Sequence, residues 1–352
     1  MTTLPSITIA DRRIGPGHPT YIIAELSANH NQDYEQAARL VHVAAESGAD
    51  AIKLQTYTAD TLTIDCDNQY FQIGEGTIWA GRRLYELYEE AFTPWEWQPR
   101  LKALAESLGL HCFSSPFDAT AVDFLEQMNV PAHKVASFEI VDIPLLKKIG
   151  STGKPVIMST GMASLAEISE GVDVLRTAGA PEVALLKCIS AYPAPAEAMN
   201  LRTIPHLAQA FAVPAGLSDH TLGITVPVAS VALGATIIEK HFTLSRSTPG
   251  PDSQFSLEPD EFRAMVEAVR TAERAVGDVY YGVSASEQKS RSFRRSLFVV
   301  QDVRKGDPFT AENVRSIRPG DGLHPRFLEE VLGRSATADI ARGTPLQWHD
   351  VG

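Results

Sequence analysis

Residues 20–56, TYIIAELSANHNQDYEQAARLVHVAAESGADAIKLQT, contain the repeating unit that decides the fold. Two short apolar runs, at 20–26 and 50–56, flank the stretch DYEQAARLVHVAAESG, whose apolar residues recur at intervals of three and four. That spacing predicts a strand, an amphipathic helix and a second strand, and Gly48 suits a left-handed helix C-cap. Such a unit implies that the two strands run parallel.

The same unit recurs along the chain. Six further apolar or β-branched runs follow the first two: HCFSSP at 111–116, AHKVAS at 132–137, PVIMST at 155–160, EVALLKC at 182–188, VPAGLSD at 213–219 and TIIEKHF at 236–242. Eight strand–helix units within about 225 residues predict an α/β fold, the closed (β/α)8 TIM barrel. An open doubly wound sheet is the competing arrangement, but it requires a glycine-rich phosphate turn that ELSANHN lacks.

Three segments lie outside the eight units. We expect residues 5–15 (PSITIADRRIG) to form a hairpin that plugs the barrel floor. Residues 57–93, which separate the second and third strands, are rich in aromatic side chains. Because a loop after a strand emerges at the catalytic face, we interpret this insertion as a lid or wall of a ligand site. A packing helix without ligand contact is the alternative.

The barrel pattern ends near Gly277, and a different pattern follows. Residues 278–295 are polar and basic, which predicts a linker. The tail contains a weak internal repeat, DVRKGDPFTAENV at 302–314 and DIARGTPLQWHDV at 339–351. The sequence therefore predicts a catalytic barrel over 1–277, a linker over 278–295 and a small, pseudo-symmetric β-rich domain over 296–352.

The composition excludes several classes of protein. The net charge of −12 argues against a general nucleic-acid binder, and an anionic substrate would have to be attracted by local cations. No run of about 18 apolar residues is present, so we expect no membrane-spanning helix, and MTTLPSITIADRR lacks the features of a secretory signal. Three cysteines are too few for a disulfide framework, so we expect a reducing cytoplasm, with Cys112 and Cys188 as buried, inert thiols.

Polar residues at the carboxyl ends of the strands are the candidates for chemistry, because a barrel builds its catalytic face there. His220 and His241 end adjacent strands, so they can share a metal ion, with Glu25 and Asp252 nearby in the cyclic order. Nitrogen and carboxylate ligands with open water positions suit Mn²⁺, Co²⁺ or Mg²⁺. A structural role is the alternative for either histidine taken alone.

The remaining strand-end residues match the inventory of a phosphate site. Lys53 and Lys134 supply positive charge, and buried lysines need an anion to offset their desolvation. Hydroxyl groups supply directional donors, and the candidates are Ser115, Ser137, Ser159 and Ser218. A single serine is more often only a strand-end residue, so the prediction depends on the whole set.

Longer stretches around these residues resemble a known family. They are IIAELSANHNQDYEQA, GADAIKLQTYTADT, SSPFD, HKVASFEI, STGM, YPAP, GLSDHTLG, EKHFTLSRSTPGPDSQFSLEP and RPGDG. Together they are similar to the sialic acid synthase (N-acetylneuraminate synthase) family over nearly the whole chain. Within that family, AELSANHNQ, KLQTYT and FTLSRSTPGPDSQFSLEP most resemble the pseudaminic acid synthase branch.

The resemblance implies a TIM barrel followed by an antifreeze-like (SAF, β-clip) domain, in a domain-swapped homodimer. It implies a metal-dependent transferase that condenses phosphoenolpyruvate with 2,4-diacetamido-2,4,6-trideoxy-altrose and water. The products would be pseudaminic acid, a nine-carbon 2-keto acid, and phosphate. N-acetylneuraminate or legionaminate synthesis, from a different amino sugar, is the alternative within the family.

The resemblance also implies roles for individual residues. His220 and His241 would bind the metal, and Glu25 and Glu139 would face the reacting carbons, with Glu25 as the expected general base. Phosphoenolpyruvate would be held by Lys53, Ser115, Lys134, Ser137, Ser159 and Ser218. Tyr192 and Asp252 would line the sugar site, with Arg318 of IRPG reaching in from the partner subunit. Asp252 is also a candidate catalytic residue, and Gln55 a candidate substrate-binding residue. Ser190 stands where the sialic branch has an asparagine, a departure at one phosphate contact.

Two other functions compete with this interpretation. A related barrel synthase that takes a phosphorylated aldose would need a second, arginine-rich phosphate site, for which Arg246 and Arg202 are the near candidates. A non-catalytic carbohydrate-binding or ice-binding protein is suggested by the antifreeze-like tail. Such a protein would not need two histidines, two lysines and two glutamates converging at the strand ends of a barrel.

Overall fold

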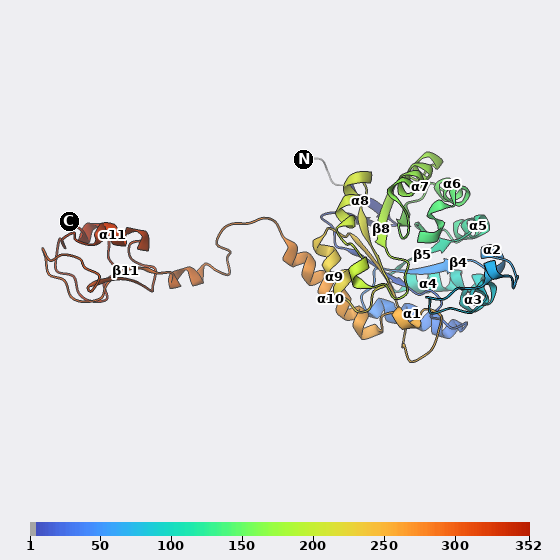
Figure 1. The fold of residues 1–352 in the computed structure, drawn as a ribbon, viewed down its shortest axis with the longest axis horizontal. Helices are drawn as coiled ribbons and strands as arrows, with labels where there is room; N and C mark the ends of the chain where they lie inside the picture. Colours follow the sequence, from blue (N-terminus) through green and yellow to red (C-terminus); the bar gives the residue numbers. More distant parts are fainter. Residues whose placement is uncertain (1–4) are drawn as a thin grey trace. The chain divides into compact units, whose positions relative to one another are not determined.

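The computed structural model describes residues 5–352. They fold into two compact units that divide after Gly277 (Figure 1). Within the described residues, no helix combines the length and the apolar character needed to cross a membrane.

Eight parallel strands close the barrel of the first unit. They are β3 (Tyr21–Glu25), β4 (Ala51–Thr56), β5 (His111–Pro116), β6 (His133–Val135), β7 (Val156–Ser159), β8 (Val183–Cys188), β9 (Ala215–Asp219) and β10 (Ile237–His241). Each strand pairs with the next in the sequence, and β10 pairs with β3 to complete the circle. Every predicted apolar run contains one of these strands, so the barrel prediction is confirmed and the open sheet is wrong.

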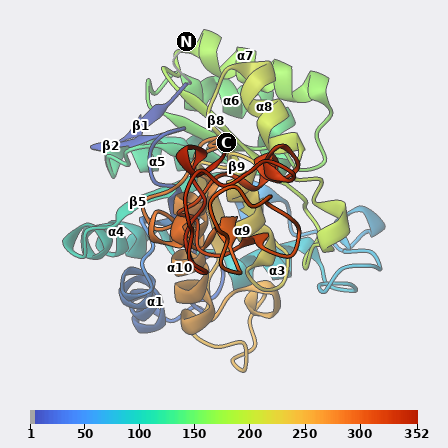
Figure 2. The same ribbon diagram turned by 90° about the vertical axis from the view of Figure 1, so that its left-hand side faces the viewer.

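Helices surround the strands in both ribbon views (Figures 1 and 2). They are α1 (Tyr34–Glu46), α2 (Ala59–Leu62), α3 (Leu84–Ala91), α4 (Gln98–Ser107), α5 (Ala119–Gln127), α6 (Ile143–Gly150), α7 (Leu165–Ala178), α8 (Thr203–Phe211), α9 (Thr225–Ala232) and α10 (Pro259–Val276). Helix α1 shows why these segments are helical. The Asp33 side chain caps its start by accepting from the amide of Glu35, and Gly48 follows its end with a φ of 87°. Its buried face packs against the strands.

Short 3₁₀ helices connect these elements. They are η1 (Gln69–Phe71), η2 (Trp95–Trp97), η3 (Ser137–Val141), η4 (Ala196–Ala198), η5 (Ser253–Phe255), η6 (Lys289–Phe293), η7 (Pro325–Phe327) and η8 (Trp348–Asp350). Two of them, η3 after β6 and η5 after β10, lie at the carboxyl end of the barrel.

The barrel floor is apolar. Strands β1 (Ile7–Ile9) and β2 (Arg12–Ile14) form an antiparallel hairpin, as predicted. Ile7, Ile9 and Ile14 are buried in one cluster with inward residues of the strands, among them Phe113 and Ile157. Burial of each isoleucine contributes about 1.5–3 kcal/mol to the stability of the fold. The floor therefore stabilises the end of the barrel on which the polar layer rests.

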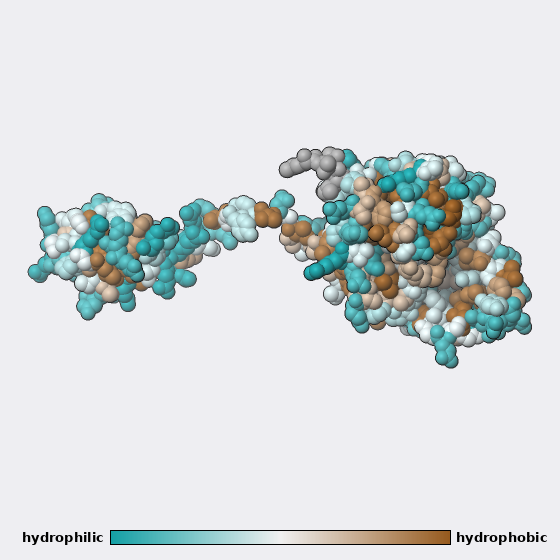
Figure 3. Space-filling view, turned by 45° about the horizontal axis from the view of Figure 1, so that its top comes forward, coloured by the Kyte–Doolittle hydropathy of each residue, from teal (hydrophilic) through white to brown (hydrophobic). Residues whose placement is uncertain are grey.

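The second unit is small and β-rich. Strands β11 (Ser296–Val299) and β12 (Val314–Ile317) pair antiparallel, and α11 (Leu328–Val331) packs on a core that includes Leu297, Phe309 and Leu346. Polar residues cover most of the face of this unit that Figure 3 shows. Residues 278–295, predicted to be a linker, are exposed or half-exposed and contain η6.

The internal repeat of the tail gives the second unit its symmetry. Val303 and Ile340, which hold equivalent places in the two repeats, exchange backbone hydrogen bonds of 2.9 and 2.8 Å. The aspartate before each of them accepts from a backbone amide of the other repeat, at 2.7 Å in both cases: Asp302 from Arg342 and Asp339 from Lys305. The predicted pseudo-symmetry is therefore confirmed.

Candidate active site at the carboxyl end of the barrel

Inward-facing residues change character along the barrel axis. Near the floor they are apolar, and Ile23, Ala51 and Ile237 belong to the floor cluster. Two residues further along the same strands they are charged: Glu25, Lys53 and Glu239. Because side chains alternate between the two faces of a strand, this step of two keeps the charged groups inside the barrel.

A buried charge network occupies this layer. Lys53 Nζ lies 2.9 Å from Glu239 Oε1 and 2.6 Å from Glu25 Oε2. Lys134 Nζ lies 3.7 Å from the same Glu239 oxygen, to which Ser218 donates at 3.1 Å. Burial lowers the pKa of Lys53 to about 8 in spite of Glu239. Burial alone would raise the pKa of Glu239, but the two lysines lower it, so the carboxylate is ionised and bound.

Serine hydroxyls line the next sector of the barrel. Lys134 Nζ donates to Ser159 Oγ at 2.7 Å, and Ser137 Oγ accepts from the amide of Gly161 at 3.0 Å. A Cβ on Gly161 would lie 2.5 Å from Ser190 Oγ and 2.7 Å from Ser137 Oγ, so only glycine allows these hydroxyls to approach. Within residues 5–352, the buried hydroxyls of Ser115 and Ser190 have no hydrogen-bond partner. Buried polar groups are normally paired, so these two hydroxyls are free to bind a ligand.

His220 and His241 lie side by side at the ends of β9 and β10. Their ring centroids are 5.3 Å apart. His220 Nδ1 donates to the carbonyl of Ile189 at 2.8 Å, which leaves its Nε2 as an acceptor. Burial and the neighbouring cations hold the pKa of His241 well below its usual value, so this imidazole is neutral. Aromatic rings enclose the pair: Tyr192 lies 4.3 Å from His220, and Phe255 lies 4.9 Å from His241, centroid to centroid.

The two histidines suit a metal site in which some coordination positions are left for water and substrate, and not one in which the protein supplies every ligand. Among the residues that the structure describes, no cluster of three or more His, Cys, Asp or Glu could enclose a metal ion. Two imidazoles, one fixed by a backbone carbonyl and the other neutral, supply two nitrogen donors. The other coordination positions would belong to water and substrate, as in catalytic metal sites.

A second polar network joins strands β3 and β4 to the segment before η5. Glu25 Oε1 accepts from the amide of Ser27 at 2.8 Å, and Ser27 Oγ hydrogen-bonds Asp252. Gln55 Nε2 donates to Ser27 Oγ at 3.2 Å. Burial raises the pKa of Asp252. Ser27, with a φ of 45°, thus connects three of the predicted site residues, a link that the sequence analysis missed.

Glu139 in η3 is the carboxyl group whose protonation is most open to change near neutral pH. Its burial raises its pKa to about 7, although Lys134 and Lys53 act in the opposite direction. Within the described part of the chain, its Oε2 atom is buried without a hydrogen-bond partner. A carboxyl group in this state can take up or release a proton during a reaction.

The insertion between β4 and β5 reaches this end of the barrel. Trp79 Nε1 donates to the carbonyl of Pro251 at 2.9 Å, and its ring lies 5.5 Å from that of Tyr192. Residues 76–79 and 190–193 line a cavity of about 480 Å³. The insertion therefore packs against Tyr192, whose ring contacts that of His220, and its contact with a ligand stays a prediction.

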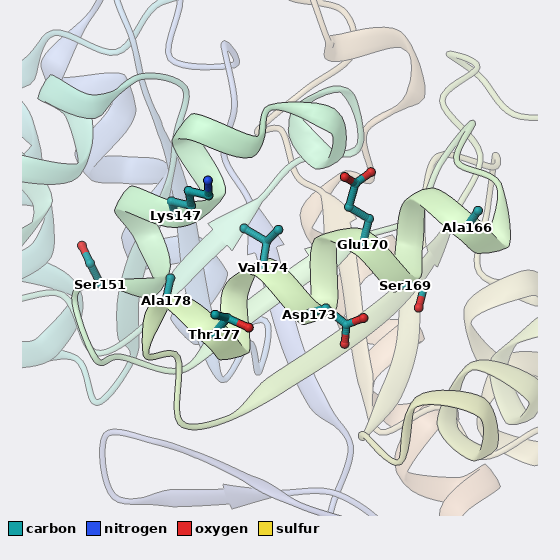
Figure 4. A pocket seen from close by; sticks show the side chains of 9 residues that line it. All are labelled: Lys147, Ser151, Ala166, Ser169, Glu170, Asp173, Val174, Thr177 and Ala178. Atoms are coloured by element: carbon teal, nitrogen blue, oxygen red, sulfur yellow. The ribbon is translucent and has the colours of Figure 1, made fainter.

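A larger cavity of about 920 Å³ lies elsewhere, between α6 and α7 (Figure 4). Its charged lining residues are Lys147, Glu170 and Asp173. These side chains stand apart on two outer helices in Figure 4, and no histidine or cysteine lines the cavity. The groove therefore lacks the convergent groups that the barrel interior has.

Two contributors to the site were undervalued from the sequence. Glu239 was not among the predicted site residues, although its position two before His241 indicates the same inward face. Cys188 is buried, as expected, but its Sγ lies 3.9 Å from His220 Nδ1. Burial alone would raise the pKa of this thiol, but the contact with His220 lowers it to about 7. Cys112 fits the expectation of an inert thiol, since burial raises its pKa to about 12.

The predicted site residues of the barrel lie at the carboxyl ends of its strands or in the segments that follow them, and their roles stay predictions. Arg318 is exposed and directly follows β12 in the second unit. Its contact with a sugar stays a prediction.

The fold and the site define a class of protein, a barrel enzyme with buried lysines, serines and a histidine pair at the carboxyl ends of its strands. The chain belongs to the NeuB family: residues 40–281 match that family, and residues 294–352 match the SAF domain. It is 46% identical to a pseudaminic acid synthase of Campylobacter jejuni over 94% of this chain and 96% of that one. It is 36% identical to an N,N'-diacetyllegionaminic acid synthase of Legionella pneumophila over 96% of both chains.

A solved relative has the same barrel. The N-acetylneuraminic acid synthetase of Leptospira borgpetersenii, determined in complex with citrate, superimposes with a TM-score of 0.72 at 32% identity. The match covers 81% of this chain and 94% of that chain. The predictions of the sialic acid synthase family and of a SAF domain after the barrel are therefore confirmed.

Proposed function

We propose that this protein is a pseudaminic acid synthase. It condenses phosphoenolpyruvate with 2,4-diacetamido-2,4,6-trideoxy-altrose and water, and it releases pseudaminic acid and phosphate. One observation carries the proposal: buried Lys53 and Lys134, the unpaired hydroxyls of two serines and the pair His220 and His241 all lie at the carboxyl ends of the barrel strands. The higher identity to the pseudaminic acid synthase than to the legionaminic acid synthase supports the choice of acceptor.

The lysines and serines bind the phosphate of phosphoenolpyruvate. Lys53 and Lys134 are buried, and within residues 5–352 their ion pairs are with Glu25 and Glu239. A phosphate bound next to these two desolvated cations is attracted more strongly than it would be in water. The free hydroxyls of Ser115 and Ser190 donate to its oxygens. As the C–O bond to phosphate breaks, the same groups stabilise the charge on the departing phosphate.

A divalent metal ion, Mn²⁺, Mg²⁺ or Co²⁺, held by His220 and His241 would supply a Lewis acid that polarises the aldehyde of the open-chain sugar. The protein itself orients the two substrates so that C3 of phosphoenolpyruvate attacks the aldehyde carbon. The new C–C bond leaves C2 electron-poor, and water adds there while a carboxylate takes its proton.

Glu139 is our preferred proton acceptor for that water. Glu25, the choice from the sequence, is engaged by Lys53 and by the amide of Ser27. Glu139 has a free buried oxygen and a pKa raised to about 7 by burial. The proton that it gains can return to the oxygen of the former aldehyde, so the carboxylate is regenerated.

The pH dependence of the reaction tests this assignment. A base must be ionised to act, so kcat/KM should rise about tenfold per pH unit below pH 7 and level off above it. Glu139→Gln should lower the rate about 100-fold and remove this limb of the profile. A wild-type profile that is flat between pH 5.5 and 7, or an unchanged limb in Glu139→Gln, would contradict the assignment.

Trp79 and Tyr192 form the wall against which the acetamido and methyl groups of the sugar pack. Trp79→Ala should raise the KM for the amino sugar about tenfold, because it removes the binding free energy of one aromatic contact. The KM for phosphoenolpyruvate should stay unchanged. Tyr70→Ala is the matched control, because Tyr70 lies in the same insertion and is 79% exposed. Equal effects of both substitutions on the sugar KM would show that the wall does not contact the sugar.

We further propose a cytoplasmic homodimer in which Arg318 of the SAF domain contacts the sugar bound by the partner. The presence of free thiols only, at Cys66, Cys112 and Cys188 in the described residues, supports a reducing compartment. The presence of a SAF domain after the barrel, with Arg318 exposed in it, supports this arrangement.

Phosphate release from phosphoenolpyruvate tests the proposed function. The proposal requires that release depend on both a divalent metal and an acetamido sugar. Release with a phosphorylated pentose and with no amino sugar would favour the phosphorylated-aldose synthase instead. The structure already weakens that rival, because the guanidinium of Arg246 is paired with the carboxylate of Glu261.

A further inference from the structure

A buried ion pair joins the two strands that carry the histidines. Asp219 and Lys240 are direct partners in the parallel register of β9 and β10, one position before His220 and His241. Both side chains are 0% exposed, and Lys240 Nζ lies 2.5 Å from Asp219 Oδ2. Since side chains alternate along a strand, the pair points toward the surrounding helices and cannot touch a substrate inside the barrel.

Thr221 closes this arrangement on the other side of His220. Its carbonyl oxygen accepts from Lys240 Nζ. Its amide donates to Asp219 Oδ1 at 3.1 Å, and its hydroxyl donates to Asp219 Oδ2 at 3.0 Å. The residues before and after His220 are therefore both tied to the residue that precedes His241.

His220 needs such a constraint because it lies just beyond the end of β9. The ladder hydrogen bonds of the barrel therefore do not fix its backbone from both sides. Its carbonyl accepts from the amide of Ala194 at 2.9 Å, and its ring is turned by the carbonyl of Ile189. Neither contact relates His220 to His241, whereas the ion pair and Thr221 do.

The chemistry of the pair supports a positioning role. A buried ion pair is costly to desolvate, and well-packed apolar residues often stabilise a fold as much or more. The preceding outward residues of the same strands, Leu217 and Ile238, are apolar. An ammonium group can hold a carboxylate and a carbonyl at once, which no aliphatic side chain can do.

We propose that Asp219, Thr221 and Lys240 form a brace that fixes the spacing of His220 and His241 for a divalent metal ion. The inference rests on the metal role given to the histidines in the proposed function. The brace residues are positioning residues, and they act on the metal through the backbone on either side of His220.

The affinity for Mn²⁺ in the absence of substrates tests the brace. The variant Asp219→Asn/Lys240→Met removes both charges together, so it leaves no unpaired buried ion. Its Kd for Mn²⁺, measured by electron paramagnetic resonance of the free ion, should rise about 10–100-fold, as for other groups that orient metal ligands. Its Kd for phosphoenolpyruvate without metal should stay within about twofold of the wild type, because the phosphate pocket is built from other residues.

A control variant tests whether the loss of an ion pair elsewhere in the barrel also weakens Mn²⁺ binding. Glu126→Gln/Lys154→Met removes another ion pair of the barrel, in which Lys154 Nζ lies 3.0 Å from Glu126 Oε1, and should leave Mn²⁺ affinity unchanged. Should the brace variant not fold, Thr221→Val is measured in its place, with an expected loss of about threefold from a single hydrogen bond.

The outcomes distinguish the brace from the metal role of the histidines. In one outcome, the wild type binds Mn²⁺, His220→Ala does not, and the folded brace variant binds it as tightly as the wild type. This outcome overturns the brace and keeps the metal site, and the same holds for Thr221→Val where that variant is used instead. A wild type that binds no Mn²⁺, or binds it equally after His220→Ala, overturns the metal role and the brace with it.

Discussion

His220→Ala and His241→Ala should each abolish turnover, with a loss of at least about 1000-fold, or roughly 4 kcal/mol of transition-state stabilisation. Each substitution removes one of the two nitrogen donors, and the described residues contain no group of three or more His, Cys, Asp or Glu that could hold a metal ion. The measurement is phosphate release from phosphoenolpyruvate with saturating amino sugar and added Mn²⁺.

Neither substitution should unfold the chain. His241 Nδ1 has no hydrogen-bond partner within residues 5–352, and His220 is tied mainly to one carbonyl. Thermal unfolding should therefore stay close to that of the wild type. His206→Ala, at an exposed position on α8, is the control and should keep full activity. Full activity of either site variant in the presence of metal would remove the histidines from the mechanism.

Lys53→Met should have the largest effect on stability. Lys53 is the shared counterion of Glu25 and Glu239, and all three are buried. Removing one member of a buried ion pair costs about 3–5 kcal/mol, because an uncompensated charge remains. Urea unfolding should show this loss, together with loss of the stabilisation that phosphoenolpyruvate gives to the wild type.

A second substitution separates charge from packing. Glu25→Gln in the Lys53→Met background removes the carboxylate that has lost its lysine, whereas Glu239 still has Lys134 at 3.7 Å. The change keeps nearly constant volume, so a large part of the lost stability should return. Binding of phosphoenolpyruvate should not return, because the cation is still missing. Equal stability of the single and double variants would show that Lys53 acts through its size and not through its charge.

The sequence predicted the fold well because strands and helices of a barrel are coded locally. Each run of six or seven residues carries its own apolar character, and the glycine that follows α1 marks its end. The rule that catalytic groups sit at strand carboxyl ends then located Glu25, Lys53, Lys134 and the two histidines.

The missing parts of the site depend on neighbours that are distant in the sequence. Glu239 is central because Lys53 lies 186 residues away in the chain and 2.9 Å away in space. The preference for Glu139 over Glu25 follows from burial and pairing, which residue type does not encode. Ser27 gains its role from a left-handed backbone conformation that its residue type rarely adopts.

The choice of acceptor is the central claim, and a competition between sugars tests it most directly. The enzyme is given phosphoenolpyruvate, Mn²⁺ and equal amounts of three acceptors: 2,4-diacetamido-2,4,6-trideoxy-altrose, one of its stereoisomers and a hexose with a single acetamido group. Products are separated by chromatography and identified by mass. We predict that pseudaminic acid dominates, and a dominant product from either competing sugar would contradict the proposed function.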